Sequence, residues 1–185
     1  MAQEDYNELL AESFDHLNKG RNRMALISAK KIYESKPEEF RSICCYAWAQ
    51  LENGNPHQAL ELANYAVQIH PNETDARLYR GYLLMRMSIF EGAVTDLDYA
   101  ISHKTDMLMW AYCNKARALT GLGKYFEALE EIDRSIKLNG PETKISYHIL
   151  SIYTFLLHCF SAQGSGNFTG FLIFCENLDI RLLQT

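Results

Sequence analysis

The stretch GLGKYFEALEEIDRSIKL, from Gly121 to Leu138, is the strongest indication of the fold, because its helical spacing of small and large apolar residues recurs three times upstream. Ala128, Ile132 and Ser135 lie on one stripe of a helix, and charged side chains occupy most of the other positions. The same stripe recurs 35 residues upstream and then at two steps of 34, as Ala93, Leu97 and Ala100, then Ala59, Ala63 and Ala66, then Ala25, Ala29 and Ile32. The sequence therefore predicts a helical repeat of about 34 residues.

A second helix is expected before each of these, marked by a small residue twelve positions before the stripe begins. The markers are Ser13, Ala47, Gly81 and Ala116. Small side chains at such positions let two helices pack closely. Polar or glycine-bearing turns are expected within each pair at 19–22, 53–56, 87–89 and 121–124. Pro37, Pro71 and the pair Gly140 and Pro141 end the second helices, whereas the third unit has Thr105 there.

A helix–turn–helix unit of this length resembles the tetratricopeptide repeat (TPR), and the likeness covers roughly residues 4–141. The resemblance implies an all-α fold: a right-handed superhelix of antiparallel helix pairs, that is, a TPR solenoid of about four repeats plus a C-terminal capping helix. We expect repeats at 4–37, 38–71, 72–105 and 106–141, a capping helix at 142–160 and an apolar tail at 161–185.

The first helices depart from the family pattern at two positions. Where the family prefers tryptophan, this chain has Leu9, Ile43, Arg77 and Tyr112. Where the family prefers leucine before the small marker, it has Glu12, Tyr46, Arg80 and Lys115.

Composition bounds the class of protein. The chain has 185 residues, of which 48% are hydrophobic and 22% charged, so there is ample apolar surface for a folded domain. A net charge of -5 and a pI near 5.7 disfavour a nucleic-acid partner, which calls for a basic face. We expect no secretory signal within residues 1–22, and five cysteines without a CxxC motif suit a reducing compartment, so a cytoplasmic location is predicted.

Residues 145–175 contain no Asp, Glu, Lys or Arg. Three interpretations compete: a helix packed on the last repeat, a membrane anchor, or a non-native or alternatively encoded end. Polar residues such as Ser146, His148 and Thr154 interrupt the apolar run, which argues against a membrane span. Packing on the last repeat is the preferred interpretation.

In this family the first helices line the inner, concave wall. The resemblance implies a partner-binding groove made by Leu10, Phe14, Leu17, Cys44, Trp48, Leu51, Leu78, Tyr82, Met85, Trp110, Cys113 and Arg117. Aromatic residues such as Phe14, Trp48 and Tyr82 would grip an apolar or helical segment of a partner. The alternative is that these rings are core between helices, because large apolar stripes are more often core than binding site.

The charged residues at the groove positions indicate which partners the groove could bind. Family members that hold an acidic C-terminal tail use lysine, asparagine and arginine on the groove. The corresponding positions here carry Leu10, Phe14, Cys45, Tyr79 and Trp110, with Asn114 the one residue left of that pattern, so a carboxylate clamp is not expected. Arginines gather on the first helices of the third and fourth units, at Arg77, Arg80, Arg86 and Arg117. They pair either with acids of a partner or, preferably, with Glu52, Glu91 or Asp96 of the chain itself.

Catalytic patterns are weak. The histidines and cysteines lack metal-ligand spacing, and no glycine-rich phosphate loop is present, so we expect no catalytic residue, no metal and no cofactor. The predicted function is a non-catalytic protein–protein interaction module, an adaptor or a chaperone-like protein, whose partner is a protein or peptide. The alternative is a regulatory or assembly subunit that docks through its uncharged C-terminal stretch to another subunit or a membrane, or that forms a homodimer there.

Overall fold

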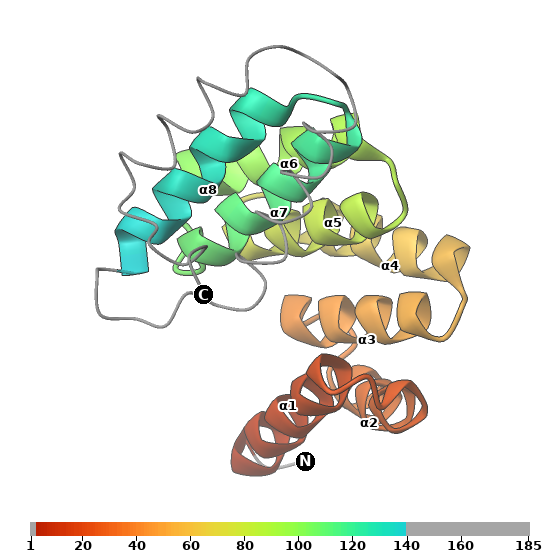
Figure 1. Ribbon diagram of the computed structural model, residues 1–185. Coiled ribbons are helices and arrows are strands. Elements are labelled where there is room, and N and C mark those ends of the chain that lie inside the picture. The colour runs from red at the N-terminus through yellow and green to blue at the C-terminus, as the bar shows by residue number, and fades with distance from the viewer. Residues whose placement is uncertain (1–2, 140–185) are drawn as a thin grey trace, which may run out of the picture. The chain divides into compact units, whose positions relative to one another are not determined.

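The computed structural model describes residues 3–139, which form eight α-helices and contain no strand (Figure 1). The helices are α1 (Gln3–Asn18), α2 (Asn22–Ser35), α3 (Phe40–Glu52), α4 (Pro56–Ile69), α5 (Thr74–Arg86), α6 (Phe90–Ser102), α7 (Leu108–Gly121) and α8 (Tyr125–Asn139). The predicted all-α helical repeat fold is confirmed. The capping helix predicted at 142–160 and the tail at 161–185 lie outside the described residues.

The turn inside each helix pair uses one left-handed residue at the same place in the repeat. Gly20, Gly54 and Gly123 have φ of +66°, +82° and +73°, a region that glycine enters without steric cost. The third unit has Ser88 there, with φ of +61°. The backbone of the turn is therefore set by the repeat, and the side chain at this position adapts to it.

Thr105 occupies the position of Pro37 and Pro71 in the first two units. Hydrogen bonds of its side chain hold the turn there. Its hydroxyl donates to Asp75 Oδ1 at 2.7 Å and accepts from the backbone N–H of Met107 at 3.2 Å. Lys104, just before it, has φ of +56°, which stops the helix. The chain thus turns from α6 into α7 without a proline.

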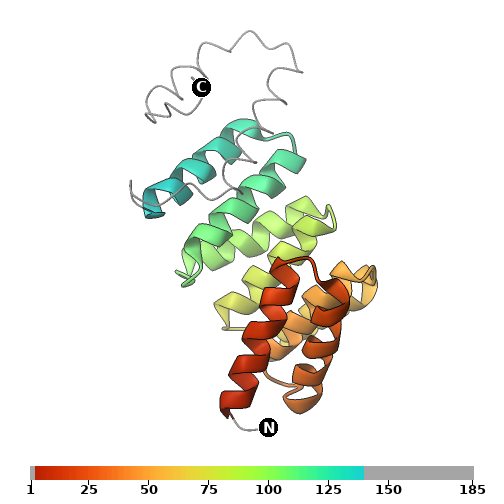
Figure 2. The same cartoon turned by 60° about the horizontal axis from the view of Figure 1, so that its bottom comes forward.

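Each helix packs on the next one along the chain, as Figures 1 and 2 both show. In addition α1 contacts α3, α3 contacts α5 and α5 contacts α7, whereas the even-numbered helices make no such contacts of similar extent with one another. The odd-numbered helices, called the inner helices below, therefore form the closer layer. The predicted stripe is buried throughout: Ala59, Ala93 and Ala128 are each 0% exposed.

Gly81 shows why the marker position is small. A Cβ on Gly81 of α5 would lie 2.9 Å from Leu97 Cγ and 3.3 Å from the carbonyl oxygen of Ala93, both on α6. The backbones of α5 and α6 are thus in close contact.

Each helix among residues 3–139 is too short or too polar to span a membrane.

Candidate partner-binding surface

Five aromatic side chains from the inner helices form one connected group, called the aromatic cluster: Phe14, Trp48, Tyr79, Tyr82 and Trp110. The ring centroids of Phe14 and Trp48 are 6.0 Å apart, those of Trp48 and Tyr82 are 4.8 Å apart, and those of Tyr82 and Trp110 are 5.0 Å apart. Such separations are typical of interacting aromatic pairs. Four helices that are distant in sequence thus contribute to a single apolar surface.

Some ring contacts skip a whole helix pair. Phe14 of α1 stacks on Tyr79 of α5 at 5.9 Å, and Trp48 of α3 approaches Trp110 of α7 at 6.4 Å. Tyr79 is not among the predicted groove residues, because it lies two residues before the marker Gly81, whereas the predicted groove positions of this unit, Leu78, Tyr82 and Met85, lie three before, one after and four after it. Burial raises the pKa of its hydroxyl. Its closeness to Phe14 depends on how strongly the stack curves, which local spacing does not show.

The predicted groove residues divide by burial. Leu10, Leu17, Cys44, Leu78, Tyr82 and Met85 are at most 7% exposed, so they form core between the helices. Phe14, Trp48, Leu51, Trp110 and Cys113 are partly exposed, and Arg117 is exposed. The partly exposed residues and Arg117 are the part of the predicted set that is accessible without rearrangement.

Hydrogen bonds hold the rings in place. Trp48 Nε1 donates to Glu52 Oε1 at 3.1 Å, and Arg86 Nη1 donates to the Tyr82 hydroxyl at 2.8 Å. Arg86 Nη2 also donates to Glu52 Oε2 at 3.1 Å, which links the two bonds. Burial raises the pKa of Tyr82, so its hydroxyl stays protonated at neutral pH. These hydrogen bonds therefore favour one arrangement of Trp48 and Tyr82.

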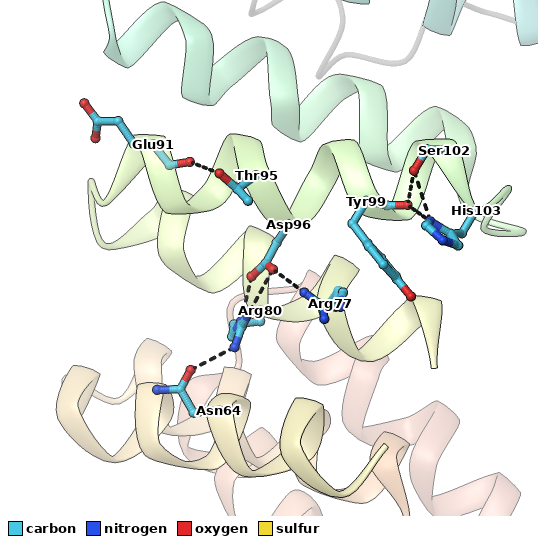
Figure 3. Close-up of polar contacts among 9 residues, drawn as sticks. All are labelled: Asn64, Arg77, Arg80, Glu91, Thr95, Asp96, Tyr99, Ser102 and His103. Atoms are coloured by element: carbon cyan, nitrogen blue, oxygen red, sulfur yellow. Dashed lines mark hydrogen bonds and ion pairs between the residues drawn. The ribbon is translucent and has the colours of Figure 1, made fainter. Parts of the chain in front are cut away.

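Three of the four gathered arginines pair within the chain. Asp96 of α6, only 2% exposed, accepts from Arg80 Nε at 2.6 Å and Nη2 at 2.8 Å, and Arg77 Nη1 lies 3.6 Å from it (Figure 3). Arg86 pairs with Glu52. Arg117 forms no ion pair with any described residue. Its charge is therefore the one of the four that is available to a partner.

The Arg80 contact recurs one unit later. Lys115 Nζ lies 2.7 Å from Glu131 Oε1, and both this pair and Arg80 with Asp96 are separated by 16 residues. Each cation also reaches the preceding second helix: Arg80 bonds Asn64 Oδ1 at 3.2 Å and Lys115 lies 2.7 Å from Asp98 Oδ1. These contacts explain why Arg80 and Lys115 stand where the family prefers leucine. The sequence signal for this pairing is a pair of opposite charges 16 residues apart that recurs in successive units.

The described thiols are poor nucleophiles. Burial raises the pKa of Cys44 and Cys113, and it raises that of Cys45 to about 12, so all three are protonated at neutral pH. Among residues 3–139, no group of three or more His, Cys, Asp or Glu side chains could hold a metal ion. Asn114, the residue left from the clamp pattern, is buried and donates to the carbonyl of Trp110 at 2.8 Å.

Comparison with solved structures places the chain among helical repeat proteins. It is similar to a thermophilic TPR protein of Thermus thermophilus, with a TM-score of 0.65, 17% identity, and coverage of 82% of this chain and 79% of that one. It is similar to YrrB, a TPR protein with an unusual peptide-binding site, with a TM-score of 0.57, 18% identity, and coverage of 77% and 71%.

The fold also occurs within an enzyme. An O-GlcNAc transferase of Thermobaculum terrenum matches with a TM-score of 0.57 and 20% identity, over 72% of this chain but 27% of that one. No protein-family model and no curated protein matches the sequence. At these identities the likeness establishes the fold alone.

Proposed function

We propose, from the tetratricopeptide repeat fold and its aromatic cluster, that the chain is a non-catalytic protein–protein interaction module. It holds an apolar or helical segment of a partner against the inner helices, as an adaptor or a chaperone-like protein does. The free thiols of Cys44, Cys45 and Cys113 fit a reducing compartment, so we place this function in the cytoplasm.

The observation that carries the proposal is the partial exposure of Phe14, Trp48 and Trp110 within one connected cluster. Rigid aromatic side chains are enriched among residues that dominate binding energy, because they bury a large area at a small cost in entropy. The bond from Trp48 to Glu52 fixes the indole, which lowers the entropy lost on binding. The peptide-binding site of YrrB, which has this fold, is compatible with the proposal.

Arg117 indicates which charge a bound segment would carry. In the repeat it takes the position that Phe14, Trp48 and Tyr82 hold in the other units, so a row of three rings ends on a cation. Arg117 is exposed and has no acidic partner among the described residues. A bound segment that presents apolar residues to the rings and an Asp or Glu to Arg117 would match both features.

The test uses the two tryptophans, Trp48 and Trp110, which are the only ones in the chain and both belong to the cluster. Peptides selected from a displayed library against the full chain are titrated, and indole fluorescence is followed. Trp48→Ala should weaken binding of the selected peptides by about 2 kcal/mol, roughly thirtyfold. In that variant Trp110 still reports binding.

Tyr46→Ala is the matched control. Tyr46 is also a partly buried aromatic residue of α3, but its ring stacks on Tyr33 of α2 at 5.2 Å, outside the aromatic cluster. Its loss should leave the affinity within about twofold, because it does not face the proposed surface. If Trp48→Ala folds and binds like the original chain, or if both variants weaken binding equally, the cluster is core and the proposal is wrong.

A further inference from the structure

The outer face of α2 exposes large apolar side chains. Met24 is 52% exposed and Ile27 is 60% exposed. They are three residues apart and therefore neighbours on the helix surface. This face belongs to the even-numbered helices and is separate from the aromatic cluster.

The same positions are not apolar in any other second helix. Met24 and Ile27 correspond in the repeat to Gln58 and Glu61 in α4, Gly92 and Thr95 in α6, and Glu127 and Glu130 in α8. Since the local backbone repeats, burial within the chain does not account for an apolar pair in α2 alone. The difference between the units points to something outside the described residues.

Cations surround Ile27. At 100° per residue, Arg23, Lys30 and Lys31 lie within about 60° of Ile27 around the helix axis, and all three are exposed. The Lys30–Glu34 pair, at 3.7 Å with both side chains at least 60% exposed, is too solvated to neutralise this charge. Of the four second helices, α2 is the one with more basic than acidic residues.

We propose that this face of α2 docks an acidic amphipathic helix of a partner protein. An apolar side chain of that helix packs on Ile27 and Met24, and Asp or Glu residues on either side of it meet Arg23, Lys30 and Lys31. An apolar centre with a charged rim is the usual anatomy of a small protein interface. The complementary charges set the orientation of the bound helix and speed its association.

An anionic bilayer is the competing occupant, and the observations favour it less. Three cations near a bilayer contribute about 1 kcal/mol each, but only two side chains of α2 could insert. Apart from these three cations the chain carries a net charge of -8, which is the total of -5 less 3, and a bilayer would repel that charge. A single acidic helix meets the basic face without approaching the rest of the chain.

The probe is a fluorescein-labelled, helix-stabilised peptide of about 16 residues with a leucine stripe flanked by glutamates, and its counterpart has lysine in place of every glutamate. Anisotropy is measured against the full chain. Ile27→Glu introduces the residue type found at Glu61 and Glu130, so it should fold. This substitution should weaken binding of the acidic peptide at least tenfold. Thr95→Glu, which makes the same charge change at the equivalent exposed position of α6, should change affinity less than twofold.

Several results would overturn the proposal. The proposal is wrong if the acidic peptide fails to bind at millimolar concentrations of the chain, if the lysine peptide binds equally well, or if Thr95→Glu weakens binding as much as Ile27→Glu. Vesicles with phosphatidylserine, bound in an Ile27-dependent way in place of the peptide, would show a membrane surface instead. Sedimentation that reveals self-association lost in Ile27→Glu would show that a second copy of the chain covers α2.

Discussion

Replacing Gly81 by alanine separates two opposing effects at a single helical position. Gly81 lies inside α5, where alanine is the better helix former by about 0.5–1 kcal/mol. The added methyl group would stand 2.9 Å from Leu97 Cγ and 3.2 Å from Asp96 Cβ, and Leu97 is 0% exposed. A fully buried branch point and a neighbouring backbone carbonyl cannot move aside without shifting α6.

Overpacking of this kind costs about 1–3 kcal/mol, which exceeds the gain in helix propensity. We therefore expect Gly81→Ala to destabilise the fold by about 1 kcal/mol. Gly92→Ala is the matched control, because Gly92 lies in α6 and an added Cβ there meets its nearest atom, Leu84 Cδ1, at an ordinary 3.4 Å. This control should be stabilising by about 1 kcal/mol, because only the gain in helix propensity remains there. The difference between the two variants, about 2 kcal/mol, then isolates the packing effect.

Urea unfolding followed by far-UV circular dichroism measures both variants against the original chain. A difference of about 2 kcal/mol corresponds to roughly 5 °C in Tm for a chain of this size. If Gly81→Ala proves as stable as Gly92→Ala, the close approach of α5 and α6 at Gly81 is refuted, and with it the register assigned to the third unit.

Three further predictions concern charge, protonation and the end of the chain. Asp96→Ala leaves two arginines without their buried acceptor and should cost about 2–3 kcal/mol in urea unfolding, whereas Glu34→Ala at the solvent-exposed pair should cost less than about 0.5 kcal/mol; equal costs would contradict the network. Burial raises the pKa of Cys44, and that of Cys45 to about 12, so stability should be full below about pH 8.5 and fall as pH rises toward 12, because only the unfolded thiols ionise in that range. Urea midpoints between pH 7 and 10 should show this fall and show a smaller one in Cys45→Ala, and an unchanged slope would argue against burial of that thiol. A chain that ends at Gly140 should unfold at lower urea if residues 142–160 cover the last repeat, whereas an unchanged midpoint would show that they do not.

The candidate surface could be predicted only in part. The row Phe14, Trp48 and Tyr82 follows from the repeat register, but the sequence left open whether these rings are core or surface. Tyr82 is buried and Phe14 and Trp48 are partly exposed, although all three hold the same position in their units. Position in the repeat does not predict exposure, because burial also depends on side chains that other units place around a ring.

The helices, their turns and the buried stripe follow from the local spacing of residues in the sequence. A period of 3.6 residues places Ala59, Ala63 and Ala66 on one side of α4, and the hydrophobic effect favours burial of that side against any apolar neighbour. The contacts of Phe14 with Tyr79 and of Trp48 with Trp110 could not be read from the sequence, because these rings come from different units. Their separation depends on the rotation between successive helix pairs. That rotation is set by the summed packing of all the facing side chains, and no single repeat encodes it.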